Sequence, residues 1–137
     1  MATSIASLET ATPLPTPTPL PNVRVRAGDE ALFDGDWEKA LSEYQFVLSE
    51  TSDPKLTQEA MLGSARSYVQ GNDDLAAIPL LEELLANHPE AINAASTHFE
   101  LAEAYMRQER YLEAVEQYSG YLAKKPGAID AYVFAKR

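Results

Sequence analysis

The chain has 137 residues, no cysteine and a formal net charge of −10, from 21 acidic and 11 basic residues. This charge would repel nucleic acid and anionic membrane surfaces, so neither is an expected partner. The lack of cysteine excludes disulfides, thiolate catalysis and cysteine-based zinc sites, and no apolar run approaches the roughly 18 residues that a helix needs for direct membrane insertion.

The first segment of the chain, residues 1–21, is rich in proline and threonine. Five of the nine prolines lie between Pro13 and Pro21, in the run PLPTPTPLP. Each proline fixes its own φ, lacks a backbone donor and favours extended geometry in the residue before it. We therefore predict a disordered, extended linker, and a ligand for a proline-binding domain is the alternative. The segment has neither the basic start nor the continuous apolar stretch of a secretory signal.

From residue 22 onward the pattern of apolar residues is helical, and no segment alternates like a strand. Asp53 followed by Pro54 is typical of a helix start, because aspartate caps the helix and proline suits its first turn. Pro89 is expected to open a helix in the same way. The predicted helices are 23–34, 37–50, 54–70, 74–87, 90–108 and 111–124, and a partial seventh begins near Gly127.

Three blocks of the sequence repeat at a spacing of 37 residues. Two sets of small residues coincide across the blocks: Gly28, Ala65 and Ala102, and then Ala40, Ala77 and Ala114. Four residues after the second set stand Tyr44, Leu81 and Tyr118. Small residues allow two helices to approach closely, and a large side chain fills the space against the next block. The repeat therefore predicts paired antiparallel helices that stack in sequence order.

This pattern resembles the tetratricopeptide family, whose units combine a small residue, a tyrosine, Ala-x3-Phe and a proline. The third block matches it with Ala102-x2-Tyr105, Ala114-x3-Tyr118 and Pro126. Family units have 34 residues, and we place the three additional residues at the start of the third unit, as nearly one extra helical turn. The resemblance implies an all-α solenoid over 22–137, with units at about 22–54, 55–89 and 90–126 and a partial fourth helix at 127–137.

No pattern in the sequence is typical of an active site. His88 and His98, the two histidines, lack the i, i+4 spacing of a helical metal pair, and packing or turn roles are predicted for both. Carboxylates such as Glu100 and Glu103 share a helix face, but acid–base catalysis also needs a pocket that shifts their pKa values. We expect no enzyme activity, no catalytic residue, no metal and no cofactor.

The resemblance also implies a binding surface, because in this family the first helix of each pair lines a concave groove in which protein or peptide partners lie. The side chains at these places are apolar, aromatic and of both charges, which suits an extended or helical peptide. Packing in the core is the alternative for some of them, above all Val69 and Phe99. The implied groove residues are Arg26, Asp29, Leu32, Phe33, Leu62, Arg66, Val69, Gln70, Phe99, Glu100, Glu103, Met106 and Arg107.

One use of the family is not expected here. Repeat domains that clamp the C-terminal carboxylate of a chaperone carry Lys, Asn, Asn, Lys and Arg at set groove positions. The corresponding residues of this chain are Val25, Asp29, Gly63, Ser96 and Glu100. Every one of them differs, so no carboxylate clamp is predicted.

A second resemblance concerns the larger context of the chain. The Thr/Pro leader and the segments HPE, AEAY and PGAIDAYV are similar to the N-terminal repeats of bacterial soluble lytic transglycosylases and to envelope proteins that assemble outer-membrane machinery. The catalytic Glu-Ser and Gly-Leu-Met-Gln segments of those enzymes do not occur in this sequence. Our main hypothesis is therefore a non-catalytic protein-interaction scaffold, and the alternative is the helical arm of a larger cell-envelope enzyme. The compartment stays open, with the leader slightly favouring an extracytoplasmic place over the cytoplasm.

The last segment begins the first helix of a fourth unit and stops before the second helix of that unit. Tyr132, Val133 and Phe134 are therefore predicted to have no following helix to cover them. Exposed apolar surface of this kind promotes association. The segment predicts either a longer native protein, which we favour, or weak self-association through the C-terminal helix.

Overall fold

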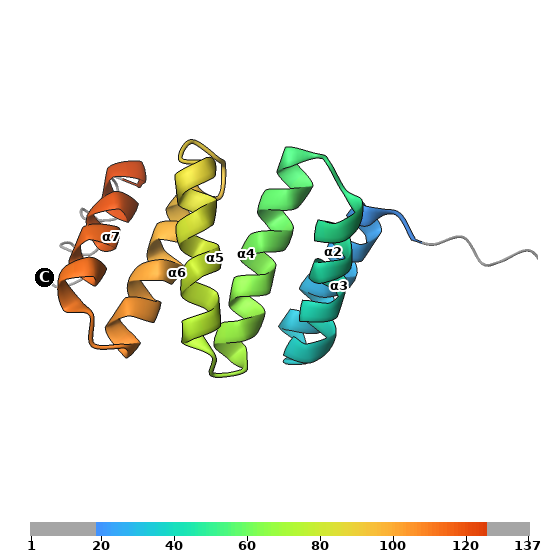
Figure 1. The fold of residues 1–137 in the computed structure, drawn as a ribbon, viewed down its shortest axis with the longest axis horizontal. Coiled ribbons are helices and arrows are strands. Elements are labelled where there is room, and N and C mark those ends of the chain that lie inside the picture. Colours follow the sequence, from blue (N-terminus) through green and yellow to red (C-terminus); the bar gives the residue numbers. More distant parts are fainter. Residues whose placement is uncertain (1–18, 126–137) are drawn as a thin grey trace, which may run out of the picture.

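The computed structural model describes residues 19–125 of the chain. Most of the predicted linker at 1–21 and all of the predicted partial helix at 127–137 lie outside these residues. The described part holds six α-helices and no strand, with the labels of Figure 1. The helices are α2 (Pro21–Phe33), α3 (Trp37–Glu50), α4 (Pro54–Gln70), α5 (Asp74–Asn87), α6 (Ala94–Arg107) and α7 (Tyr111–Lys124).

The helices stack in sequence order. Each contacts the next along the chain, and α4 also contacts α2 and α6. Figure 1 shows the turns α2–α3, α4–α5 and α6–α7 along one edge of this array, and the connections α3–α4 and α5–α6 along the opposite edge. The prediction of an all-α solenoid of helix pairs is confirmed for the described residues.

Aspartates begin three of the helices, because each supplies a carboxylate to an otherwise free backbone N–H of the first turn. Asp36 accepts a hydrogen bond from the Lys39 amide at 3.1 Å, and Asp53 and Asp73 make equivalent bonds at the starts of α4 and α5. The turn between α2 and α3 holds Gly35 at a φ of 81°, where a side chain would be strained. These local signals explain why the ends of α3, α4 and α5 could be predicted.

The third pair departs from the prediction at its start. Residues 89–93 form turns, and α6 begins only at Ala94. The side chain of Asn93 donates to the backbone carbonyl of Gln58 in α4 at 3.4 Å, which ties this loop to the preceding pair. The three additional residues therefore lengthen a connection rather than a helix. The predicted helix at 90–108, with a proline to open it, is wrong at its first turn.

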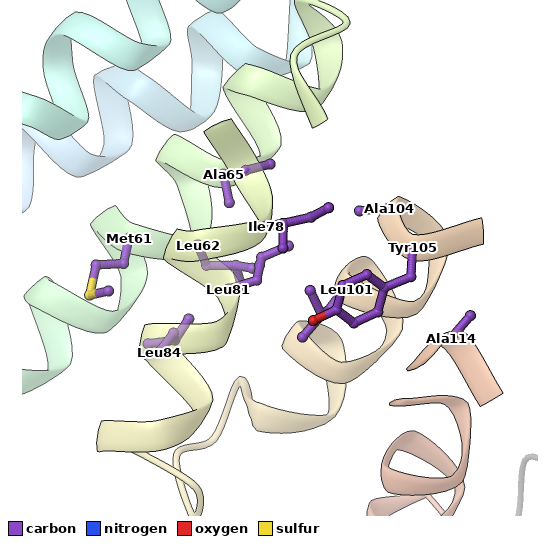
Figure 2. Packing of buried hydrophobic residues seen from close by; sticks show 11 residues of the cluster. Met61, Leu62, Ala65, Ile78, Leu81, Leu84, Leu101, Ala104, Tyr105 and Ala114 are labelled. Carbon is purple, nitrogen blue, oxygen red and sulfur yellow. The ribbon is translucent and has the colours of Figure 1, made fainter. Parts of the chain in front are cut away.

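Two buried clusters hold the stack together. The larger cluster takes residues from α4, α5, α6 and α7. Figure 2 shows Leu81 and Leu84 of α5 together with Leu101 and Tyr105 of α6. The smaller joins α2, α3 and α4 around Tyr44. The repeated small residues predicted to allow close helix approach are all buried: Gly28, Ala40, Ala65, Ala77, Ala102 and Ala114.

Tyr44 of α3 shows how closely the helices approach. Its ring is fully buried between two glycines, Gly28 of α2 and Gly63 of α4. A Cβ atom added to Gly28 would lie 2.7 Å from the ring, and one added to Gly63 would lie closer still. The hydroxyl group of Tyr44 donates to the carboxylate of Asp29 at 2.5 Å. One side chain thus joins the first pair to the second.

Candidate functional site

The face formed by α2, α4 and α6 carries most of the predicted groove residues. Because the sequence repeats every 37 residues, equivalent side chains form rows across the three helices. One row is charged and the next is apolar, and all of their members are at least partly exposed. The first row consists of Asp29, Arg66 and Glu103, and the second of Leu32, Val69 and Met106.

Two hollows lie on this face and share Arg66 and Glu100. The one toward α2 has a volume of about 240 Å³, and the one toward α7 has a volume of about 210 Å³. Besides the shared pair, the first is lined by Leu32, Val69 and Gln70 and the second by Ser96, Phe99 and Tyr121. The structure therefore brings six of the predicted groove residues together, with the charged pair between them.

The charged pair is a direct bond between α4 and α6. The Arg66 Nε–H donates to Glu100 Oε1 at 2.9 Å, and both side chains remain partly exposed. On the α7 side, Phe99 is 40% exposed, and its ring lies edge-on to Tyr118 at 6.2 Å and tilted against Tyr121 at 5.4 Å. This side of the pair is therefore an aromatic surface open to solvent.

Tyrosine hydroxyls donate hydrogen bonds to two of the carboxylates near this face. Tyr118 donates to Glu103 at 3.0 Å, as Tyr44 does to Asp29. Burial raises the pKa of each tyrosine, and the accepting carboxylate raises that pKa further. Asp29 and Glu103 therefore each hold the two helices of a pair together.

Arg107, the last residue of α6, reaches the preceding pair. Its guanidinium donates to both carboxylate oxygens of Asp74 at 3.0–3.1 Å. These hydrogen bonds are the main cause that raises the pKa of Arg107. Arg107 thus links the start of α5 to the end of α6, and it lines neither of the two hollows.

Other predicted groove residues lie elsewhere. Leu62 is 5% exposed and packs in the larger buried cluster, so it belongs to the core rather than to a groove. Arg26 and Asp29 line a separate hollow of about 650 Å³ near the first turns of α2 and α4. Phe33 is 92% exposed at the end of α2. Tyr121 of α7 lines the second hollow, but it is not among the predicted groove residues, because these come only from the first helix of each pair.

The two histidines make contacts between helices. A ring nitrogen of His98 lies 2.8 Å from the side-chain oxygen of Gln117 in α7, and a ring nitrogen of His88 lies 3.2 Å from the side-chain amide of Gln58 in α4. Within residues 19–125, no group of three or more histidine, aspartate or glutamate side chains could hold a metal ion. In the same part of the chain, no helix has the length and apolar character to cross a bilayer.

Comparison with known proteins gives one family. The model of the tetratricopeptide repeat matches residues 25–92 and again residues 62–129. The crystal structure of the TPR domain of Arabidopsis FLU is similar to this chain, with a TM-score of 0.70 and 18% identity, covering 77% of this chain and 94% of that one. No curated protein matches the sequence. The resemblance to lytic transglycosylases stays a prediction.

Proposed function

Because this chain belongs to the tetratricopeptide repeat family, whose fold serves as a protein-interaction scaffold, we propose that it binds a peptide segment of a partner protein along α4 and α6, without catalysis. The observation that carries this proposal is the pair of hollows that meet at Arg66 and Glu100. They are open to solvent on helices that line the binding groove in this family. A peptide that enters both hollows would cross the charged pair.

The lining of the hollows indicates the chemistry of the peptide. Leu32 and Val69 on one side and Phe99 on the other favour an apolar side chain in each hollow. A guanidinium has five N–H donors, and Nε is the one that bonds Glu100. Further donors of Arg66 can therefore reach a peptide carbonyl, while Glu100 can accept a peptide N–H. The groove thus suits a peptide that has one apolar side chain on each side of a polar segment.

The test begins with peptides selected by display on the whole chain. Their affinities are then measured by calorimetry for the parent, for Arg66→Ala and for Phe99→Ala. Each variant should weaken binding about tenfold or more, because large amphipathic side chains dominate interface energies. The control is Glu83→Ala, an exposed residue of α5 that lines neither hollow, and it should bind within about twofold of the parent.

Amide chemical shifts locate the bound peptide independently of the variants. Changes should concentrate at Arg66, Val69, Ser96 and Glu100. Selected peptides that bind both alanine variants as tightly as the parent would contradict the proposal. So would shift changes confined to α3, α5 and α7.

A further inference from the structure

The three turns within the helix pairs form one continuous edge, which we call the turn edge (residues 33–39, 70–75 and 106–113). Figure 1 shows these turns on the same side of the array. The indole of Trp37 packs on Gly71, where an added Cβ would lie 3.1 Å from the ring. The Gln70 side chain donates to the Leu32 carbonyl at 3.0 Å, joining the first turn to the second. The pair between Arg107 and Asp74 joins the second turn to the third.

Each turn exposes at least one large apolar side chain, and the third also exposes Tyr111 and Met106. Phe33 is 92% exposed, Leu75 is 70% exposed and Leu112 is 88% exposed. Leu75 and Leu112 are 37 residues apart, so the repeat itself places them alike. Single exposed apolar residues are common on protein surfaces, but here each of three successive turns of one edge carries one, so a partner that lies along the edge can contact all three.

The turn edge is also acidic. Its two arginines are held by carboxylates, Arg107 by Asp74 and Arg110 by Glu113. Lys39 is the one other cation of this edge, and it forms no ion pair within residues 19–125. Five exposed acids of the edge likewise form no ion pair among the described residues: Asp34, Asp36, Glu38, Asp73 and Glu109.

The opposite edge of the array differs in charge. Glu90 there pairs with Lys124 at 3.6 Å. The acids Glu50 and Asp53 are matched in number by the bases Lys55 and Lys125. The surplus of negative charge is therefore a property of the turn edge and not of both edges.

We propose that the turn edge is a docking surface for a basic amphipathic helix of a partner protein. The apolar face of such a helix would cover Phe33, Leu75 and Leu112, and its lysines and arginines would lie beside the acids of the same turns. The helices α2, α4 and α6 contact one another in this order, and packed helices are about 8–10 Å apart. The three turns that follow these helices therefore span about 20 Å, which a helix of about 13 residues covers. This surface is separate from the two hollows, with which it shares only Gln70.

The probe is a synthetic amphipathic helix of leucine and lysine, with a scrambled peptide of the same composition beside it. Fluorescence anisotropy measures the binding of each to the whole chain. The amphipathic peptide should bind at least about tenfold more tightly than the scrambled one, and high ionic strength should weaken its binding. Equal binding of the two peptides would overturn the proposal, because net charge alone would then explain the attraction.

Two sets of variants test the two parts of the surface, with one residue from each turn in each set. Phe33→Ser with Leu75→Ser and Leu112→Ser removes the most exposed apolar side chain of each turn. Asp34→Asn with Asp73→Asn and Glu109→Gln removes three charges, and asparagine preserves the cap at residue 73. Each set should weaken binding of the amphipathic probe about tenfold or more, while circular dichroism confirms the fold.

The matched control removes three exposed acids elsewhere: Glu50→Gln, Glu83→Gln and Glu116→Gln. It should leave the affinity for the probe within about twofold of the parent, and a loss equal to that of the turn-edge acids would overturn the proposal. Arg66→Ala in the groove should also leave the affinity for the probe unchanged. A loss on that substitution would place the probe in the hollows, which would overturn the docking surface without affecting the groove proposal.

Discussion

Tyr44 and Tyr118 occupy equivalent places in the first and third pairs, but their surroundings differ. Each donates a hydrogen bond to the carboxylate 15 residues earlier. Tyr44 is fully buried, because Gly63 of the next pair packs against its ring. Tyr118 is half-buried, and its described aromatic neighbour, Phe99, belongs to its own pair.

The comparison separates two contributions to stability in a stacked array. The hydrogen bond comes from residues within one pair, so it forms in both places. The complete burial of Tyr44 comes from Gly63 of the following pair. Stability in such an array is therefore shared between neighbours, as expected for a quasi-one-dimensional fold.

The largest expected effect is that of Tyr44→Ala. Removing a fully buried aromatic side chain should lower the free energy of unfolding by about 3–5 kcal/mol. Tyr118→Ala should cost roughly half as much or less, because less of its surface leaves water on folding. Urea denaturation of both variants measures the difference. Equal losses would mean that the next pair adds nothing to the burial of Tyr44.

Gly63→Ala should have the next largest effect, because the new methyl group would enter the ring of Tyr44. The expected loss is about 1–3 kcal/mol. In a Tyr44→Leu background the same substitution should cost clearly less, since the ring is gone. A double-mutant cycle measures this coupling, and additive losses would show that Tyr44 does not require glycine at residue 63.

Tyr44→Phe removes only the hydroxyl group and should cost about 1 kcal/mol. Because the folded state raises the pKa of this tyrosine, its contribution is fully present below the unfolded pKa of about 10 and is lost as the pH rises above it. Unfolding followed across alkaline pH should therefore show a shallower fall for Tyr44→Phe than for the parent. An identical pH dependence would contradict the assigned hydrogen bond.

The smallest expected effect on stability is that of Arg66→Ala. Its pair with Glu100 is partly exposed, and such pairs contribute about 0–1 kcal/mol. Thermal unfolding should therefore hardly change, although binding of a selected peptide should weaken. A large loss of stability would mean that the ion pair of Arg66 and Glu100, like Tyr44, mainly holds successive helix pairs together.

Much of the fold could be predicted because its signals are local. Asp53, Asp73 and Gly35 mark helix ends through caps and turns, and the repeated alanines mark close packing. The start of α6 could not be predicted in this way. Residues 89–93 have a helix-like pattern, but they form a loop whose Asn93 side chain bonds to the Gln58 carbonyl of α4, 35 residues earlier in the sequence.

The candidate site was less predictable than the fold. The row of Leu32, Val69 and Met106 follows from the repeat alone. The bond between Arg66 and Glu100 does not follow from the repeat, because it joins the second helix pair to the third and depends on how these two pairs are placed relative to each other. A local signal for the tyrosine bonds did exist, since Tyr44 and Tyr118 each stand the same distance after an acid.

The fit of Tyr44 to Gly63 also determines the order in which the units can be joined. The residue equivalent to Gly63 in the third unit is Glu100, which follows the smaller Leu81 rather than a tyrosine. If the first unit were spliced directly to the third, the Glu100 side chain would fall where the ring of Tyr44 lies. The units are therefore not interchangeable modules, and anyone who shuffles or extends this array must transfer Tyr44 together with Gly63.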